Sequence, residues 1–130
     1  MSTFSVEIAE TSKEFTKRER VMLKDTGNAY KLDDIVQLDA PITITPTAYA
    51  VLKIHNSKGY NPDYTNLVVL DSENNTYITG SPTFCNKFFD IWAEMYDPDE
   101  PFSIEIYKRE SKNYKGKNFL SCSIVWHNNI

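Results

Sequence analysis

The sequence contains no apolar run that approaches the length of a membrane span. Its longest runs, residues 48–52 and 67–70, are far shorter than the ~20 residues needed to cross a bilayer. The first residues also lack the basic and then apolar pattern of a signal peptide. These absences predict a cytoplasmic protein with no membrane partner.

Cysteine, histidine and glycine are scarce, which argues against several kinds of site. The two cysteines, Cys85 and Cys122, form no CxxC motif, so neither a zinc site nor a disulfide framework is expected. The histidines, His55 and His127, lack the spacing of metal ligands. None of the four glycines lies in a phosphate-binding loop motif. We therefore expect no enzymatic activity, no metal and no cofactor.

The remaining composition is that of an ordinary folded protein. The chain has 130 residues, 41% apolar and 25% charged, which predicts one domain with one substantial core. Within it we expect a polar N-terminal extension over residues 1–40, packed on or beside a domain over residues 41–130. Regular structure is expected to begin near Ile42, and residues 13–23 fit either a short helix or a strand.

The net charge of −4 conceals two basic segments. Residues 107–118, YKRESKNYKGKN, contain five Lys or Arg and one Glu and carry +4, while residues 13–24 contain five Lys or Arg and two Glu and carry +3. A protein with a net negative charge and two basic segments attracts a polyanion to those segments and repels it from the rest of its surface. The alternative is a solvated loop whose lysines serve only solubility.

Local patterns predict three strands followed by a helix. Residues 47–55, 66–70 and 76–79 are strand candidates, and the turn signal at 71–75 predicts that the last two form a hairpin. Ser81 suits a helix N-cap and Pro82 the first helical position. Five apolar side chains then recur at helical spacing: Phe84, Phe88, Ile91, Trp92 and Met95. We interpret this stripe as a core-facing surface that ends before the prolines of residues 97–101.

The last two strands complete the order of elements of an OB-fold. Residues 102–106 and 120–124 alternate between apolar and polar side chains around the basic segment. The resulting order of three strands, one helix and two strands predicts a mainly β chain with a five-stranded OB-fold-like barrel and its helix between strands three and four. In that fold the loop between the last two strands binds oligonucleotides, and the basic segment falls there.

Aromatic residues accompany the cations of this predicted loop. If the apolar side chains of the two strands face the core, Tyr107 and Phe119 face outward at its base, and Tyr114 lies at its tip. Aromatic rings stack on any base and lysines neutralise phosphates, so we expect binding of single strands; the alternative is cross-strand packing. Tyr77 is expected beside the same groove. The predicted contacts are Tyr77, Tyr107, Lys108, Arg109, Lys112, Tyr114, Lys115, Lys117 and Phe119.

Two stretches, YITGSPTFCNKFFDIWAEM from Tyr77 and SKNYKGKNFLSCSIV from Ser111, resemble small single-stranded DNA-binding proteins of bacteriophages and mobile elements of low-GC Gram-positive bacteria. The resemblance covers residues 77–125, with weaker similarity at residues 18–34 and 49–58. It implies an OB-type barrel that coats single-stranded DNA during phage or plasmid replication and recombination in the bacterial cytoplasm. It assigns DNA contacts to Lys108, Lys112, Tyr114, Lys115, Lys117 and Phe119.

A second class of function fits the same features. A small phage-type interaction module that inhibits or adapts a host protein could use the helix around Trp92 or the basic hairpin to grip an acidic partner. Loss of binding on Tyr114→Ala or Phe119→Ala would favour stacking on bases over this alternative. Open edge strands favour a homodimer, and replication or recombination proteins are candidate partners.

Overall fold

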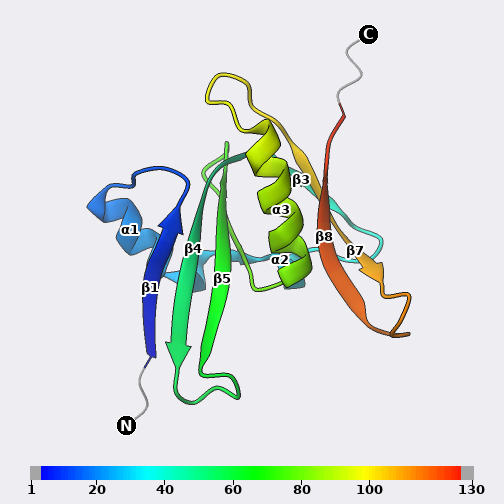
Figure 1. The fold of residues 1–130 in the computed structure, drawn as a ribbon, viewed down its shortest axis with the longest axis horizontal. Helices are drawn as coiled ribbons and strands as arrows, with labels where there is room; N and C mark the ends of the chain where they lie inside the picture. Colours follow the sequence, from blue (N-terminus) through cyan, green and yellow to red (C-terminus); the bar gives the residue numbers. More distant parts are fainter. Residues whose placement is uncertain (1–3, 127–130) are drawn as a thin grey trace.

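A computed structural model of the protein describes residues 4–126, and its strands form two sheets (Figure 1). The five-stranded sheet has the order β1-β4-β5-β6-β2, with the bounds Phe4–Thr11, Pro46–Asn56, Asp63–Asp71, Thr76–Thr79 and Tyr30–Lys31. The three-stranded sheet has the order β3-β7-β8, with the bounds Ile42–Ile44, Ile104–Glu110 and Asn118–Ile124. The helical segments are α1 (Lys17–Lys24), a 3-10 turn η1 (Thr26–Asn28), α2 (Leu32–Ile35) and α3 (Pro82–Met95).

A bent stretch of chain joins the two sheets. Thr45 alone separates β3 from β4. β3 pairs antiparallel with β7 in the smaller sheet, and β4 pairs antiparallel with β5 in the larger one. The hydroxyls of Thr45 and Ser103 lie 2.7 Å apart and share a hydrogen bond, which ties this corner to the segment that enters β7. The chain is thus mainly β, as predicted, with its core between two sheets.

The predicted five-stranded barrel is not seen as a closed sheet among the described residues. The predicted strands are present, but within residues 4–126 neither sheet closes on itself, because β6 pairs with β5 and β2 and not with β8. Tyr30 and Lys31 pair in parallel with Tyr77 and Ile78, along the edge of β6 that a closed barrel would use. The segment that follows β2 enters the core between the sheets. A non-local pairing from the N-terminal region therefore occupies the second edge of β6.

Helix α3 covers the main core with four of the five residues of the predicted stripe, whereas Met95, in the last turn, is exposed. Ser81 Oγ accepts a hydrogen bond from the Phe84 N–H at 3.3 Å, and Pro82 is the first residue of the helix. Phe84, Phe88 and Ile91 are buried. The rings of Phe88, Phe89 and Trp92 all meet Tyr49 of β4 edge-on, with centroids 5.3 to 5.9 Å apart. These contacts fix α3 against the larger sheet.

The N-terminal residues belong to the larger sheet, so the expectation that regular structure begins near Ile42 is wrong. β1 pairs antiparallel with β4 from Phe4, opposite Asn56, to Thr11, opposite Ala50. The register shifts between Ile8 and Glu10, which marks a bulge. Residues 4–11 thus form an outer strand of the sheet.

Helix α1 resolves the ambiguity of residues 13–23 in favour of a helix. The Thr16 hydroxyl accepts the Glu19 N–H at 3.2 Å, and the Glu19 carboxylate accepts the Thr16 N–H at 2.9 Å, which is a capping box. Phe15 and Leu23 are buried in a second cluster with Ala50 and other residues that alternate with those of the main core. α1 and α3 therefore pack on opposite faces of the larger sheet.

Candidate nucleic-acid interface

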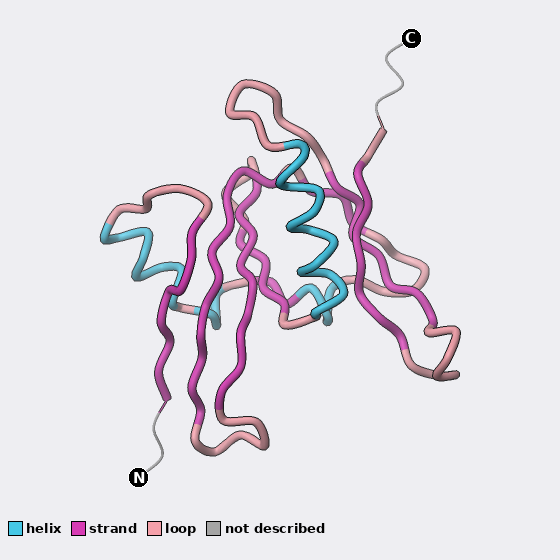
Figure 2. Tube along the Cα trace, in the orientation of Figure 1, coloured by secondary structure: helices cyan, strands magenta, loops and turns pink. Residues whose placement is uncertain are grey.

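The β7–β8 hairpin carries the basic segment and extends to the lower right of the molecule (Figure 2). The register places Arg109 opposite Phe119, on the same face as Tyr107, whereas Ile106 and Cys122 are opposed on the buried face. This confirms that Tyr107 and Phe119 are on the side turned away from the core. Both are half-buried. The outer face of the hairpin thus brings three of the predicted contact residues together.

The ring of Tyr107 is fixed in position and covered by Arg109, so it supports the Arg109 side chain and is not free to stack on a base. Its hydroxyl lies 3.0 Å from Ser123 Oγ, at hydrogen-bond distance. The Arg109 guanidinium lies over its ring, 4.6 Å from the centroid, a cation–π contact. A guanidinium held over a ring loses little further freedom when a ligand binds. The surface available to a ligand is therefore that of Arg109 and the adjacent Phe119.

The loop of the hairpin is ordered by its own backbone. The Ser111 N–H donates to the Lys117 carbonyl at 2.8 Å, and the Lys117 N–H donates to the Tyr114 carbonyl at 3.1 Å. Gly116 has a φ of 82°, which glycine adopts without strain, and its N–H donates to Glu110 Oε1 at 3.3 Å. Tyr114 is left 66% exposed, in the position that a stacking residue needs.

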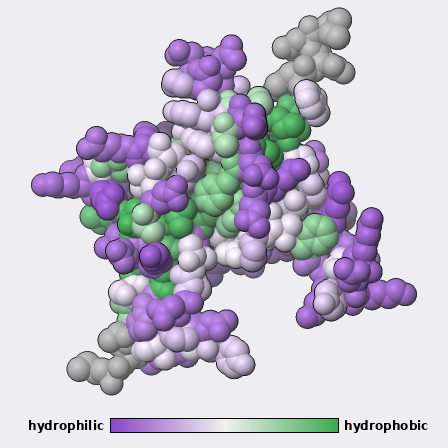
Figure 3. Space-filling model, in the orientation of Figure 1, coloured by the Kyte–Doolittle hydropathy of each residue, from purple (hydrophilic) through white to green (hydrophobic). Residues whose placement is uncertain are grey.

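Three lysines surround Tyr114 without a neutralising partner. Lys112, Lys115 and Lys117 are exposed, and none of them forms an ion pair within residues 4–126. Figure 3 shows a strongly hydrophilic projection at the lower right, where Figure 1 places the tip of this hairpin. Glu110, whose carboxylate accepts the Gly116 N–H, is the one acid in residues 107–118, so this segment keeps a net charge of +4 and its field is available to an anionic ligand.

Lys108 is directed away from this group. Lys108 lies two residues after Ile106 and therefore on the same, inner face of β7. Its Nζ donates to the backbone carbonyl of Asp33 in α2. The bond links the hairpin to the segment that enters the core between the sheets. Lys108 therefore anchors the hairpin, and the structure does not place it with the exposed lysines.

Tyr77 lies in the core rather than beside the hairpin, which corrects its predicted position. It is 8% exposed, and its hydroxyl donates to Asp71 Oδ2 at 2.9 Å. Asp71 Oδ1 also accepts the N–H groups of Glu73 and Asn75, which form the β5–β6 turn. Burial, together with the hydrogen bond to Asp71, raises the pKa of Tyr77 to about 12. These contacts give Tyr77 a structural role.

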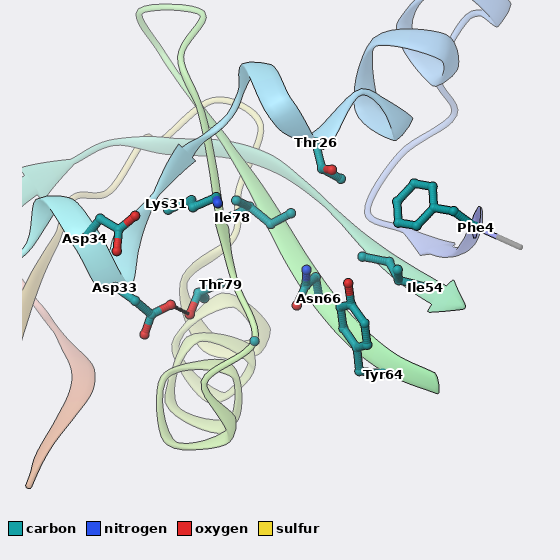
Figure 4. A pocket seen from close by; sticks show the side chains of 11 residues that line it. Phe4, Thr26, Lys31, Asp33, Asp34, Ile54, Tyr64, Asn66, Ile78 and Thr79 are labelled. Carbon is teal, nitrogen blue, oxygen red and sulfur yellow. Dashed lines mark hydrogen bonds between the residues drawn. The ribbon is translucent and has the colours of Figure 1, made fainter. Parts of the chain in front are cut away.

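A pocket that the sequence did not predict lies on the face of the larger sheet that packs against α1 (Figure 4). Its volume is about 260 Å³, and strands β1, β4, β5 and β6 line it together with η1, β2 and α2. The rings of Phe4 and Tyr64 are exposed there, and Ile54 lies between them. The pocket thus offers two aromatic surfaces over an aliphatic floor.

Polar groups complete this pocket. The Asn66 carboxamide and the Lys31 ammonium line it, and neither makes a hydrogen bond with another described residue. A Cβ at Gly80 would lie 2.8 Å from Asn66 Oδ1, so a larger residue there would displace the Asn66 side chain. Asp33 also lines the pocket, and since its carbonyl binds Lys108, the pocket and the hairpin meet at α2.

A sequence signal for this pocket exists but is weak. Phe4, Val6 and Ile8 alternate with polar or small residues, which marks a strand, and Tyr64 and Asn66 recur at the same spacing. Nothing local, however, tells which face of each strand α1 covers. The pocket depends on the pairing of β1 with β4, which joins segments about forty residues apart in sequence.

No group of three His, Cys, Asp or Glu side chains among the described residues is placed to hold a metal ion, and none of their helices combines the length and apolar character of a membrane span. His55 Nδ1 lies 2.7 Å from Asp63 Oδ1 at the surface, while His127 lies outside the described residues. Burial raises the pKa of Cys85 to about 11 and that of Cys122 to about 12. Both thiols are therefore protonated and unreactive near neutral pH.

Comparisons of the chain with protein-family models, with curated proteins and with solved structures give no match. The resemblance at residues 77–125 therefore stays a prediction from the sequence. The function is argued below from the geometry and charge of the hairpin and the pocket.

Proposed function

We propose that the protein binds single-stranded DNA without sequence preference, and that it coats or protects this DNA during phage or plasmid replication and recombination in the bacterial cytoplasm. One observation carries the proposal: the β7–β8 hairpin presents Arg109, Phe119 and Tyr114 beside lysines that make no ion pair within residues 4–126.

Stacking explains why such a surface favours single strands. A base in single-stranded DNA exposes its faces, and stacking on an aromatic side chain contributes about 1–3 kcal/mol per base. A duplex hides those faces and offers phosphates alone. Lys112, Lys115 and Lys117 attract the phosphates of either form, so the aromatic residues and Arg109 supply the preference. Neither the stacking nor the attraction of phosphates depends on which base is bound.

The order of elements supports an OB-type fold for this function. When the bent β3–β4 segment is counted as one strand, the chain from Ile42 onward runs strand, strand, strand, helix, strand, strand, which is the OB-fold order. That first strand pairs with β5 in one sheet and, through β3, with β7 in the other. The proposed fold is an OB-type barrel that is interrupted between β6 and β8.

The pocket of Figure 4 extends the proposed binding surface. Phe4 and Tyr64 add two exposed rings, and Asn66 adds an amide that can pair with a base edge. Asp33 and Asp34 on its border repel phosphates, so a strand here would place its bases toward the sheet and its backbone toward solvent.

Fluorescence anisotropy of labelled oligo(dT) and of a duplex of equal length, each titrated at low and moderate salt, tests the proposal. We expect tighter binding of the single strand. With three or four phosphate contacts and ~0.7 per contact, log K should fall against log salt with a slope of about −2 to −3. Equal affinity for the duplex would contradict the role of the aromatic residues. Absence of binding to both at low salt would favour a hairpin that contacts a protein.

Substitutions in the hairpin separate stacking from charge. Tyr114→Ala and Phe119→Leu, which keeps an apolar side chain at a half-buried position, should each weaken oligo(dT) binding by about 1–3 kcal/mol. Lys115→Ala should mainly reduce the salt slope, by ~0.7. The matched controls are Tyr96→Ala and Lys87→Ala, exposed residues of α3 or its C-cap, which should leave affinity unchanged. Equal losses in the hairpin and control variants would contradict the site.

A further inference from the structure

A second surface, distant from the hairpin loop, is an apolar groove between α3 and the end of β8. Its volume is about 430 Å³, and its apolar lining includes Ile91, Met95, Phe102, Ile124 and Trp126. Trp126 is 86% exposed, and Met95 is also exposed. Figure 3 shows hydrophobic surface in this region, at the upper right, where Figure 1 places the end of β8. An exposed apolar surface rimmed by polar residues indicates an interaction site.

Two acids and one lysine line the groove: Asp90, Glu94 and Lys87. The segment that follows α3 in the sequence contains three more acids, Asp97, Asp99 and Glu100. Residues 87–100 contain these five acids and a single lysine, Lys87, so they carry −4. A partner for this groove must therefore combine apolar side chains with several cations.

Helix α1 of the same chain has this combination. Val21 and Met22 are 70% and 67% exposed, and the basic segment 13–24 that contains them carries +3. One of its two glutamates, Glu19, is engaged in the capping box. The buried residue of α1, Leu23, anchors the helix to its own sheet, which leaves Val21 and Met22 directed to solvent between cations.

We propose that the groove of one molecule receives α1 of a second copy, with Val21 and Met22 on the apolar floor and Arg18 and Arg20 facing the acids that line it. Because α1 and α3 pack on opposite faces of the larger sheet, the contact joins different surfaces of the two copies, head to tail. Such a contact repeats from copy to copy and builds an open array when the rotation between copies does not close into a ring. The hairpin loop takes no part in it and stays available to a ligand.

The proposed contact between α1 and the groove is small, so the association of two copies is weak. One helix of eight residues in one groove falls at the low end of protein interfaces, where association is weak and transient. Copies bound side by side on one strand would meet at a high effective concentration. The proposed contact then favours contiguous coverage of the strand without making the free protein a stable oligomer.

Sedimentation velocity of the full chain without DNA tests the contact independently of the proposed function. The wild type should show a sedimentation coefficient that rises with protein concentration at low salt, and less so at high salt. A groove variant, Asp90→Lys with Glu94→Lys, and a helix variant, Arg18→Glu with Arg20→Glu, should each weaken self-association by about tenfold or more. All four positions are exposed, and circular dichroism verifies the fold.

The mixture of the two variants is the decisive measurement. In it, each reversed surface meets an oppositely charged one on the other variant, so association should return to the wild-type level. A wild type that stays monomeric at all concentrations would overturn the proposal, and so would a mixture that stays monomeric. Self-association that neither variant weakens, as expected for pairing through the edge of β1, would also overturn it.

Discussion

The same residue type has opposite roles at Tyr77 and Tyr114 because their surroundings differ. The Tyr77 hydroxyl satisfies a carboxylate, Asp71, whose other oxygen holds the turn between β5 and β6. The Tyr114 side chain makes no hydrogen bond or ring contact with the described residues and is mostly exposed. The sequence places both near turns with polar neighbours, so it cannot distinguish an interior tyrosine from an exposed one.

Replacing Tyr77 by Phe tests this assignment. Loss of a hydrogen bond to a buried carboxylate should lower the free energy of unfolding by about 1.5–3 kcal/mol, measured by urea denaturation. Oligo(dT) affinity should not change. The matched control is Tyr30→Phe, because the exposed Tyr30 ring lies 5.7 Å from that of Tyr77 while its hydroxyl has no partner among the described residues. Weaker DNA binding at unchanged stability would instead assign Tyr77 to the interface.

At the scale of elements, segments with local signals were predictable. The N-cap and the apolar stripe of α3 come from one continuous segment, Ser81 to Met95. The β5–β6 hairpin follows from the turn at residues 71–75. The outer face of the β7–β8 hairpin also followed from alternation alone. Each of these predictions needs only neighbours in sequence, which is why the structure agrees with it.

Elements that depend on distant pairing were not predictable in the same way. β2 has two residues, and its parallel pairing with β6 joins positions 47 apart, Tyr30 and Tyr77. α2 is a single turn of four residues, and nothing local shows that it enters the core. The pairing along the second edge of β6 and the position of Lys108 both depend on this segment.

A pair of substitutions in and near α2 measures how much this segment holds the sheets together. Leu32 is fully buried in the main core, so Leu32→Ala should lower the free energy of unfolding by about 2–5 kcal/mol through the cavity it leaves. Ile35→Ala, in the same turn but exposed, should change it by less than about 0.5 kcal/mol. Urea denaturation of both variants gives the comparison. Similar small losses would mean that residues 1–40 are an appendage to the barrel.

Over the whole molecule, the groups with a raised pKa gather in and around the main core. Burial is the leading cause for each of them, and the nearby carboxylates of Glu10, Asp71 and Asp33 raise the pKa of Tyr49, Tyr77 and Cys85 further. The fourth group, Cys122, lies within the core cluster. All four are neutral when protonated, so the packing of this core depends on their retaining a proton.

Stability should therefore fall in alkaline solution. The ordinary pKa of a thiol is 9. Below this pH both the folded and the unfolded chain hold these protons, and the fold has its full stability. Above it the unfolded chain loses protons first, because Cys85, Tyr77 and Cys122 retain theirs in the fold until about 11 or 12, so the free energy of unfolding falls with rising pH. Urea denaturation at pH 7.5 and 10.5 measures the loss. Added salt is the control, since it screens repulsion among surface charges and leaves buried groups largely unaffected; a loss that salt abolishes, or no loss at all, would contradict the role of the core.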